Sequence, residues 1–365
     1  MPAPFAAGIQ SAAMRQERPG TERLLALVAG MEGRPVLMLV DLVVDRFVTG
    51  TPKRISREAP VLILRHEHEE ILPGGGANAV ANVAALGGRP LPVGVVGEDE
   101  SGEGLLAALA ARGIPVDGIL RRAGYRTPTK VRILAGGRHS IKQQVVRYDV
   151  EDELPPGGDD VADLAGRLAR WKGEARVAVL SDYGYGAVDP ALVAPCREAV
   201  GGGTLLCDSR FRLEEFGGVD GATPNEEEAE RLLERTGAAA PPGIASGEGW
   251  RAAGSALRER LGTAFLLVTR GSAGMVLFEP GRCAHLPVHG TDQVADVTGA
   301  GDTVIGAFGL ALAAGASPLE AALLANYAGG VVVMKRGTAT LDRGELAAAV
   351  SSDPALLEQV RWEPC

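Results

Sequence analysis

The sequence predicts an α/β fold in which a doubly wound, mostly parallel sheet is flanked by helices and carries a second, small β-sheet as a lid. Three apolar runs, at residues 36–40, 177–180 and 204–207, each end at a polar residue, which is typical of buried parallel strands. After residue 91, strand and helix patterns follow one another in turn. Residues 59–72 and 130–150 instead alternate, which predicts the strands of the small sheet.

Composition indicates a globular protein with a large core, because the 365 residues are 46% hydrophobic and 23% charged. The net charge of −9 disfavours a broad surface for nucleic acid or for an anionic membrane. Any anionic ligand must therefore bind in a local basic pocket. No apolar run approaches the roughly 20 residues of a membrane helix. We therefore expect neither a nucleic-acid nor a membrane partner.

The four cysteines, Cys196, Cys207, Cys283 and Cys365, are far apart in sequence and form no CxxC pair. We expect neither a zinc site nor a disulfide framework from this spacing. Residues 1–10 lack a basic segment followed by an apolar core. These observations predict a cytoplasmic protein.

The elements are expected in three parts: an N-terminal extension at residues 1–34, the main domain at 35–351, and a C-terminal tail at 352–365. Leu24, Leu25, Leu27 and Val28 form one apolar face of a short helix in the extension. The lid strands lie at about 50–73 and 128–150. Further helices are predicted at residues 160–171, 190–200, 225–235, 250–261 and 318–335, with a hairpin across 274–288.

Aspartates follow the first predicted strand, where ligands gather in open α/β sheets. Asp41 comes directly after the strand and Asp45 four residues later. Both are candidates for binding sugar hydroxyls. Aspartates that only form turns are the alternative.

A glycine-rich segment at residues 73–79 opens a predicted helix that continues to residue 85. Gly74 and Gly75 allow the backbone to approach a ligand, and Asn78 offers an amide to it. The segment also matches the GxGxxA pattern of dinucleotide-dependent oxidoreductases. Residues 66–72 are too polar for the buried strand that this pattern requires, and Pro73 interrupts its turn, so we disfavour that alternative.

The polar positions of the lid strands are notably basic for an acidic protein. This clustering predicts an anionic substrate beneath the small sheet, although solvated strand faces would give the same pattern. The residues concerned are Arg54, Arg65, Lys130, Arg132, Lys142 and Arg147.

The segment at residues 296–303 predicts an anion site at the start of a helix. The backbone N–H groups of Gly299, Ala300 and Gly301 can meet at the positive end of that helix. Asp302 at its rim can take a proton from an alcohol that attacks a bound phosphoryl group, which indicates phosphoryl transfer from a nucleotide. The alternative is an ordinary helix capped by Thr298, with Asp302 in its first turn.

Four motifs occur in the order found in the ribokinase-like (PfkB) sugar kinases, which the chain resembles over about residues 36–349. They are Gly74-Gly75 with Asn78, Asn225 with Glu228, residues 268–271 and residues 296–302. Residues 54–61 and 180–183 are similar to those of the D-glycero-β-D-manno-heptose-7-phosphate kinases, including the kinase half of the bifunctional heptose enzyme. The resemblance implies a ribokinase-like fold and an ATP-dependent sugar kinase.

By this resemblance Asp302 is the general base, and the amides of Gly299, Ala300 and Gly301 stabilise the transferring group. The resemblance implies ATP and Mg²⁺, with Glu228 holding the ion directly or through water, and possible use of K⁺ at Asp296 and Thr298. The implied nucleotide-binding residues are Asn225, Glu226, Glu227, Glu228, Thr269, Gly271 and Asn326.

On the substrate side, the resemblance implies that Asp45, Gly74, Gly75 and Asn78 bind sugar hydroxyls. Cations for a sugar phosphate would come from Lys53, Arg54, Lys130, Arg132 and Arg147. The lid edges favour a homodimer.

Three residues depart from the family pattern: Val40, Tyr185 and Ser209. Because Val40 and Tyr185 fall near the expected sugar pocket, the sequence leaves open a kinase for another sugar, sugar phosphate or nucleoside, as in ribokinases and fructokinases. A nucleotide-binding relative without turnover is a further alternative, which the intact Asp302 disfavours.

Overall fold

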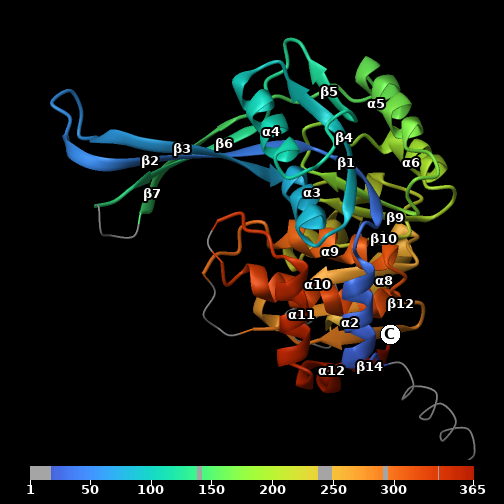
Figure 1. Cartoon of the computed structure of the whole chain (residues 1–365). Helices are drawn as coiled ribbons and strands as arrows, with labels where there is room; N and C mark the ends of the chain where they lie inside the picture. The colour runs from blue at the N-terminus through green and yellow to red at the C-terminus, as the bar shows by residue number, and fades with distance from the viewer. Residues whose placement is uncertain (1–17, 138–141, 237–248, 291–294, 336) are drawn as a thin grey trace, which may run out of the picture.

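The computed structural model describes residues 18–137, 142–236, 249–290, 295–335 and 337–365, which fold around two sheets (Figure 1). The strands of the larger sheet are β1 (Pro35–Val40), β4 (Arg89–Gly97), β5 (Ile119–Arg122), β8 (Val177–Asp182), β9 (Thr204–Ser209), β10 (Gly221–Ala222), β11 (Phe265–Thr269), β12 (Met275–Glu279), β13 (Arg282–Leu286) and β14 (Arg361–Pro364). Their order is β14-β13-β12-β11-β10-β9-β8-β1-β4-β5. Pairing is parallel from β5 to β11 and antiparallel from β11 to β14.

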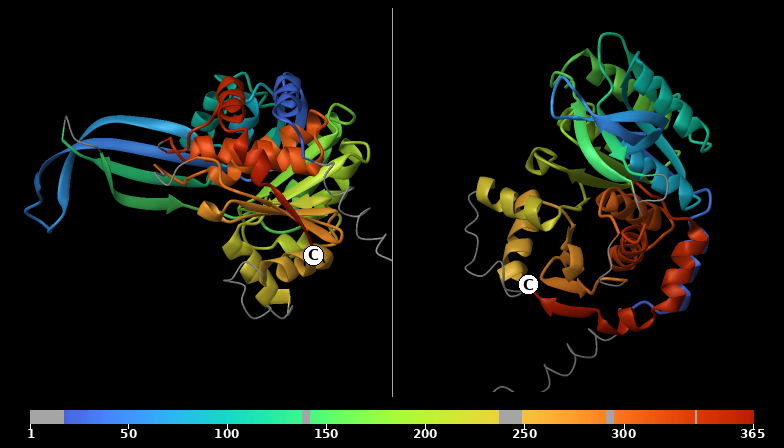
Figure 2. Two further views of the ribbon diagram at one scale, coloured as in Figure 1. Left: turned by 90° about the horizontal axis from the view of Figure 1, so that it is seen from below. Right: turned by 90° about the vertical axis from the view of Figure 1, so that its left-hand side faces the viewer.

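Helices cover both faces of this sheet because its central strands are apolar on both sides. In β1, Val36, Met38 and Val40 face one core, while Leu37 and Leu39 face the other. The first core is closed by α2 (Thr21–Gly30), α3 (Gly76–Ala85), α4 (Glu100–Ala110), α9 (Ala300–Ala313), α10 (Pro318–Val332), α11 (Arg343–Ser352) and α12 (Ala355–Gln359). The second is closed by α5 (Asp159–Arg170), α6 (Val193–Ala199), α7 (Glu226–Thr236) and α8 (Gly249–Leu261). Figure 2 shows these layers.

The second sheet projects from the body as a lid with the order β3-β2-β6-β7 (Figure 1). Its strands are β2 (Leu42–Ile55), β3 (Leu62–Gly75), β6 (Thr129–Ala135) and β7 (Gln143–Val150). Only Asp41 separates β2 from β1, and β3 leads directly into α3. The roots of the lid are therefore held at the carboxyl edge of the large sheet, where β1 ends.

The architecture confirms the predicted α/β fold with its small lid. The predicted helices and the hairpin are also present, with three short 3₁₀ turns at η1 (Pro190–Leu192), η2 (Leu213–Glu215) and η3 (Gly271–Ala273). In the predicted N-terminal extension, α2 packs against α11, and residues 1–17 lie outside the described part of the chain. None of the described helices combines the length and the apolar character needed to cross a membrane.

The predicted C-terminal tail is instead part of the body. Residues 355–359 form α12, and β14 pairs with β13 as the last strand of the large sheet. The expectation of no disulfide is also wrong, because this pairing brings Cys283 and Cys365 together as a disulfide with their Cα atoms 5.9 Å apart. A separation of 82 residues gave no local signal for it.

Candidate active site

The loop before α9 forms a turn that only glycine fits comfortably. Gly299 has φ = 77° and is the N-cap residue, so the helix begins at Ala300 and Thr298 is not its cap. A Cβ atom on Gly299 would lie 2.4 Å from the Nδ2 atom of Asn78, which excludes a side chain there. The N–H of Ala300 donates to the carbonyl of Val297 (3.2 Å). Within the described residues, the N–H groups of Gly299 and Gly301 remain for an anion.

Asp302 lies in the first turn of α9 with its carboxylate 3% exposed. Its Oδ1 accepts a hydrogen bond from the Tyr183 hydroxyl (2.6 Å), and its Oδ2 accepts one from Asn78 Nδ2 (3.1 Å). Burial raises the pKa of Asp302 to about 6, while these two donors lower it. The carboxylate is therefore fixed in place and mostly ionised at neutral pH, as a general base must be.

Asn78 reaches Asp302 from the first turn of α3. Asn82, one turn later, donates to the Oδ1 of Asn78 (3.2 Å), which leaves the Nδ2 of Asn78 to face Asp302. Asn82 was not among the predicted site residues. The i, i+4 spacing of two buried asparagines was the available sequence signal.

Residues at the root of the lid surround Asp45. This aspartate is 2% exposed and forms an ion pair with Arg132. A Cβ atom on Gly74 would lie 2.7 Å from the Cγ of Asp45, so glycine lets the two strands approach here. Gly75 follows with φ = 50°. Lys130 lies beside Asp45 in the register of β2 and β6, with its Nζ 5.3 Å from the centre of the Tyr183 ring. The structure thus brings five predicted substrate residues to the lid root.

The other three predicted substrate cations, Lys53, Arg54 and Arg147, behave differently. Arg147 on β7 forms a surface ion pair with Asp149, whose Oδ1 lies 2.8 Å from the Arg147 Nε. Arg54 lies at the far end of β2, about 30 Å of strand from Asp45 at roughly 3.3 Å per residue. Arg54 and its neighbour Lys53 are exposed there, so the expectation that they join the substrate site within one chain is wrong.

Asp41 is a structural residue, which corrects the expectation that it binds sugar. Its buried carboxylate accepts the backbone N–H groups of Tyr183 (2.8 Å), Tyr185 (3.0 Å) and Ala187 (3.0 Å). Burial and the nearby Asp182 raise its pKa to about 6. Asp41 therefore anchors the loop after β8 and has no open side for a sugar.

An apolar cavity of about 370 Å³ adjoins the start of α9. It has the dimensions and the few polar groups expected for a nucleotide base and ribose. Asn326 lies in its wall, where its Nδ2 donates to the carbonyl of Pro287 (2.7 Å). The lining includes Thr269, Gly271, Met275, Val288, Ala300, Gly301, Val304, Asn326 and Val333.

A polar cavity of about 360 Å³ continues from the apolar one past Gly301. Asn225 and Glu228 cap α7 reciprocally there: Glu228 Oε2 accepts the Asn225 N–H (2.9 Å), and Asn225 Oδ1 accepts the Glu228 N–H (2.8 Å). Burial and the neighbouring Glu228 raise the pKa of Asp208, which lines the same cavity. A cation placed between these two acids would relieve their repulsion.

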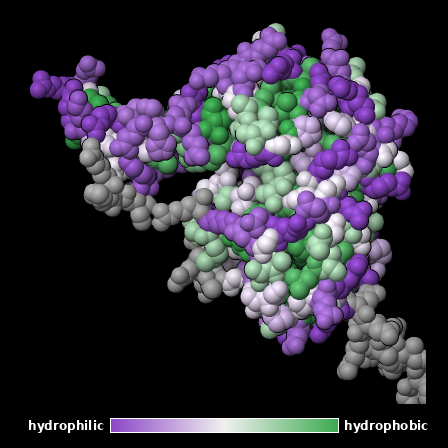
Figure 3. Space-filling model, viewed as in Figure 1, coloured by the Kyte–Doolittle hydropathy of each residue, from purple (hydrophilic) through white to green (hydrophobic). Residues whose placement is uncertain are grey.

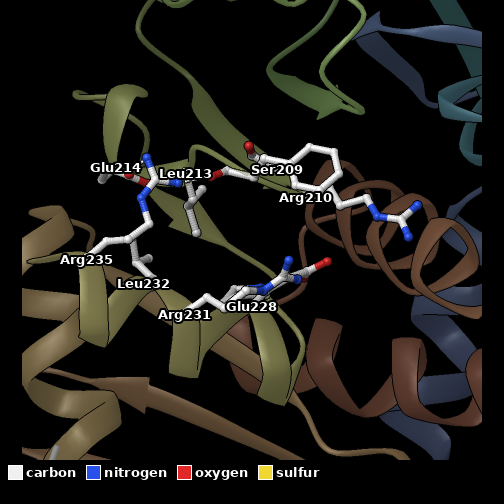
Figure 4. Close-up of a pocket in the computed structure, with 10 residues that line it drawn as sticks. Ser209, Arg210, Leu213, Glu214, Glu228, Arg231, Leu232 and Arg235 are labelled. Carbon is white, nitrogen blue, oxygen red and sulfur yellow. Dashed lines mark hydrogen bonds and ion pairs between the residues drawn. The ribbon is translucent and has the colours of Figure 1, made fainter. Parts of the chain in front are cut away.

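The acids of the first turn of α7 separate into two groups. Glu227 and Glu228 line the polar cavity, whereas Glu226 pairs with Arg270 (3.2 Å) and lines neither cavity. A smaller cavity of about 140 Å³ opens beside the polar one and shares Arg210, Glu228 and Arg231 with it. Figure 4 shows Arg210 extending away from Glu214 and Arg235, which lie at the other end of this small cavity.

Asp296 and Thr298 lie in the loop that leads to α9. Asp296 Oδ1 accepts the Thr298 N–H (2.9 Å), and its Oδ2 accepts the Gly337 N–H (3.1 Å). The carboxylate thus ties this loop to residue 337. The structure brings both residues close to the anion site.

Residues 36–149 and 212–343 match the model of the pfkB family of carbohydrate kinases. The chain belongs to this family. It is therefore an ATP-dependent phosphotransferase that acts on a sugar, a class of enzyme that uses ATP with a divalent cation. The buried carboxylate of Asp302, the free N–H groups before it and the adjoining nucleotide-sized cavity fit that class.

Curated relatives include two proteins named "Bifunctional protein HldE". The one from Mesorhizobium japonicum is 38% identical over 342 residues, which cover 92% of this kinase and 66% of the relative. The one from Azotobacter vinelandii is 41% identical over 326 residues, which cover 87% and 64%. The chain thus spans about two thirds of the length of the curated relatives it matches.

Solved structures share the ribokinase-like fold at low identity. Arabidopsis thaliana ribokinase, in complex with ribose and ATP, matches with a TM-score of 0.66 and 22% identity over 87% of this chain and 99% of that one. Escherichia coli phosphofructokinase-2, in complex with substrates and products, gives 0.67 and 19% over the same shares. These likenesses concern the fold.

Besides Asn82, three more residues of the site were missing from the predicted set. Tyr183, Asp208 and Arg210 line the polar cavity, and the hydroxyl of Tyr183 donates a hydrogen bond to Asp302. All three follow or end the strands β8 and β9, at the edge where parallel sheets gather ligands. That rule could have identified them, because both strands were recognised in the sequence.

Proposed function

We propose that this kinase transfers the γ-phosphoryl group of ATP to the anomeric 1-hydroxyl of D-glycero-β-D-manno-heptose 7-phosphate, giving the 1,7-bisphosphate and ADP. Two observations support this substrate. One is the 38–41% identity to HldE proteins over about 90% of the chain. The other, on which the proposal mainly rests, is a pair of cations beside the base that lack a carboxylate partner.

These cations are Lys130 on β6 and Arg210 after β9. Within the described residues, neither Lys130 nor Arg210 makes an ion pair, and each lies over an aromatic ring: Lys130 over Tyr183 at 5.3 Å and Arg210 over Phe211 at 5.6 Å. Burial lowers the pKa of Lys130, as does repulsion from Arg210 and Arg147, while Asp45 and Asp302 act in the opposite direction, so these charges share one region. Arg132 and Arg147 are already neutralised by Asp45 and Asp149. An incoming phosphate would satisfy Lys130 and Arg210 at once.

In the proposed reaction, Asp302 accepts the proton of the sugar hydroxyl as its oxygen attacks the γ-phosphorus and ADP leaves. The free N–H groups of Gly299 and Gly301 stabilise the charge on the transferring group, so the protein supplies positioning and electrostatics. Closure of the lid excludes water and suppresses hydrolysis of ATP.

Mg²⁺ fits the polar cavity because Glu228 and Asp208 offer carboxylates there, and this ion needs few protein ligands beside water and phosphate. It would neutralise the phosphates of ATP. Asp296 and Thr298 are the proposed residues for K⁺. We assign the enzyme to the cytoplasm because its phosphoryl donor is ATP.

The test is coupled ADP release from ATP·Mg²⁺ by the purified protein with D-glycero-D-manno-heptose 7-phosphate, ribose, fructose or fructose 6-phosphate. Selective turnover of the heptose phosphate is the expected result. Turnover of ribose or fructose alone would contradict the role of Lys130 and Arg210 and would identify Val40 and Tyr185 as marks of a changed sugar pocket.

We also propose a homodimer through the lid. The outer strands β3 and β7 have open edges, and apolar side chains are exposed along the lid, among them Ile55 (67%), Val61 (55%) and Val146 (50%). Figure 3 shows apolar atoms among polar ones near its end. Light scattering should give twice the mass of one chain, and a monomer at all concentrations would contradict the proposal.

A further inference from the structure

The loop after β8 carries two tyrosines with different partners. The Tyr183 hydroxyl donates to Asp302 Oδ1 at 2.6 Å, whereas the Tyr185 hydroxyl donates to Glu151 Oε1 at 2.8 Å. Asp41 fixes the backbone of both through their N–H groups. Tyr183 is further confined by Lys130, which lies over its ring, and by Gly75, where an added Cβ would lie 3.4 Å from the ring. The phenol therefore has little freedom to leave the base.

We propose that Tyr183 is a positioning residue for phosphoryl transfer, whose hydroxyl fixes the Asp302 carboxylate in the orientation that receives the proton of the sugar. The inference rests on the proposed role of Asp302 as the base. It assigns no role to a particular sugar. Tyr183 acts through Asp302 and forms no bond to phosphorus.

The Tyr183 hydroxyl matters for the orientation of Asp302 because few groups hold this carboxylate. Asp302 has two donors to its carboxylate, Tyr183 from the loop after β8 and Asn78 from α3. The charged groups that face it are Asp45 and Lys130 from the lid and Asp208 from the end of β9. Asp45 opposes ionisation of Asp302 and Lys130 favours it. Removing the phenolic hydroxyl would take away the shorter of the two bonds and leave a buried carboxylate held at one oxygen.

Two consequences follow for a Tyr183→Phe variant. The carboxylate would rotate more freely about its remaining bond to Asn78, so we expect kcat to fall about tenfold or more. The ionised form would also lose a donor, so the acid limb of the pH profile of kcat/KM should move upward by about one pH unit. Melting temperature and nucleotide affinity should stay close to those of the wild type.

The matched control is Tyr185→Phe, which removes a hydroxyl from the same loop but from a bond to Glu151. It should leave the acid limb unmoved. A second measurement places 3-fluorotyrosine at position 183. Its more acidic phenol is a stronger donor, so the acid limb should move downward. Opposite shifts from these two changes would not arise from loosening of the loop.

The ADP-release assay uses whichever of the four sugars named above is turned over: the heptose 7-phosphate, ribose, fructose or fructose 6-phosphate. The test of Tyr183 therefore does not depend on the heptose assignment. The Asp302→Asn variant is measured in the same assay. Activity retained in Asp302→Asn would refute the proposed base itself. An inactive Asp302→Asn together with an unmoved acid limb in Tyr183→Phe and in the fluorinated protein would overturn only the role of Tyr183. A Tyr183→Phe variant that melts much lower, with no shift from fluorination, would also overturn it.

Discussion

The carboxyl edge of the large sheet and the outer strand β7 of the lid hold their charges in different ways. In the large sheet, β1 is buried on both faces, and the carboxylates at its carboxyl edge are enclosed: Asp41 is 1% exposed and Asp302 is 3% exposed. Each accepts hydrogen bonds at both oxygens. On the lid, nearly every residue of β7 is exposed, and Arg147 meets Asp149 at the surface.

This difference corresponds to two tasks of a kinase, which are to position a base and to bind the substrate. Buried, fully bonded acids lose little on binding substrate because they are already in place, whereas exposed ion pairs contribute little to stability and can exchange partners. The body therefore holds the proposed base, and the lid carries Lys130, a cation without an ion pair that a substrate can recruit. Four substitutions or treatments would break or sharpen this contrast.

The largest expected effect is that of Asp302→Asn on turnover. Without a base, kcat should fall by about a thousandfold while nucleotide affinity changes little. In the wild type, kcat/KM should decline below about pH 6, where Asp302 becomes protonated. Steady-state kinetics over pH 5–9 with nucleotide titration check both, and a joint loss of turnover and ATP binding would indicate a structural role instead.

The same variant tests the cost of burying this charge. Because the pKa of Asp302 is raised from 3.8 to about 6, its contribution to stability is full below about pH 3.8 and is lost as the pH rises through 6. At pH 8 the neutral asparagine should therefore melt no lower than the wild type. A clear fall in melting temperature would contradict the raised pKa.

Asp41→Ala should be the most damaging change to stability. It leaves three N–H groups without an acceptor, those of Tyr185 and Ala187 in buried positions where each costs about 1–3 kcal/mol, and frees the loop that carries Tyr183. Thermal melts should show a large decrease, and kcat should fall with it. Tyr185→Phe keeps all three backbone bonds and serves as the control. An unchanged melting temperature in Asp41→Ala would show that the loop after β8 keeps its conformation without the Asp41 carboxylate.

On the lid, Lys130→Ala should act on binding more than on stability. Loss of a cation without a carboxylate partner should raise KM for a sugar phosphate about tenfold or more, since each 1.4 kcal/mol is a factor of ten. The measurement is made at pH 8, where Asp302 is ionised. Lys142→Ala is the control, because Lys142 pairs with Glu67 (2.8 Å). Equal effects of the two variants would show that lid charge acts only at long range.

The smallest effect on catalysis is expected at the disulfide. Cys365→Ser, or reduction of the wild type, releases β14 from β13, so the melting temperature should fall by several degrees, in line with about 2–4 kcal/mol for a typical disulfide. Kinetic constants should not change. Loss of activity on reduction would mean that β14 supports the nucleotide cavity.

Much of the fold could be predicted from local patterns. The apolar runs at residues 36–40, 177–180 and 204–207 became β1, β8 and β9, and the glycine-rich loops before α3 and α9 lie at one edge of the sheet. A strand that is buried on both faces is apolar at nearly every position. These elements could therefore be recognised from their own residues, without knowledge of their neighbours. Asp302 and Asn78 were predicted for the same reason, since each opens a helix after such a loop.

The partners of the polar groups required the tertiary structure. Asp41 and Asp45 follow the same strand, yet the first anchors a loop and the second pairs with Arg132. Arg54 and Lys130 have the same charge, yet the length of β2 carries one away from the site. Nothing in the local sequence distinguishes the members of either pair, because their partners come from other segments.

The sequence by itself therefore determined the elements, the glycine-rich loop before α9 and the candidate base, Asp302. The tertiary structure alone decided which groups surround that base and which charges stay unpaired. The physical reason is distance along the chain: Tyr183 meets Asp302 across 119 residues and Asp41 across 142. Hydrophobic periodicity acts within a few residues, whereas a hydrogen bond needs atoms placed to within a few tenths of an ångström by the packing of whole elements.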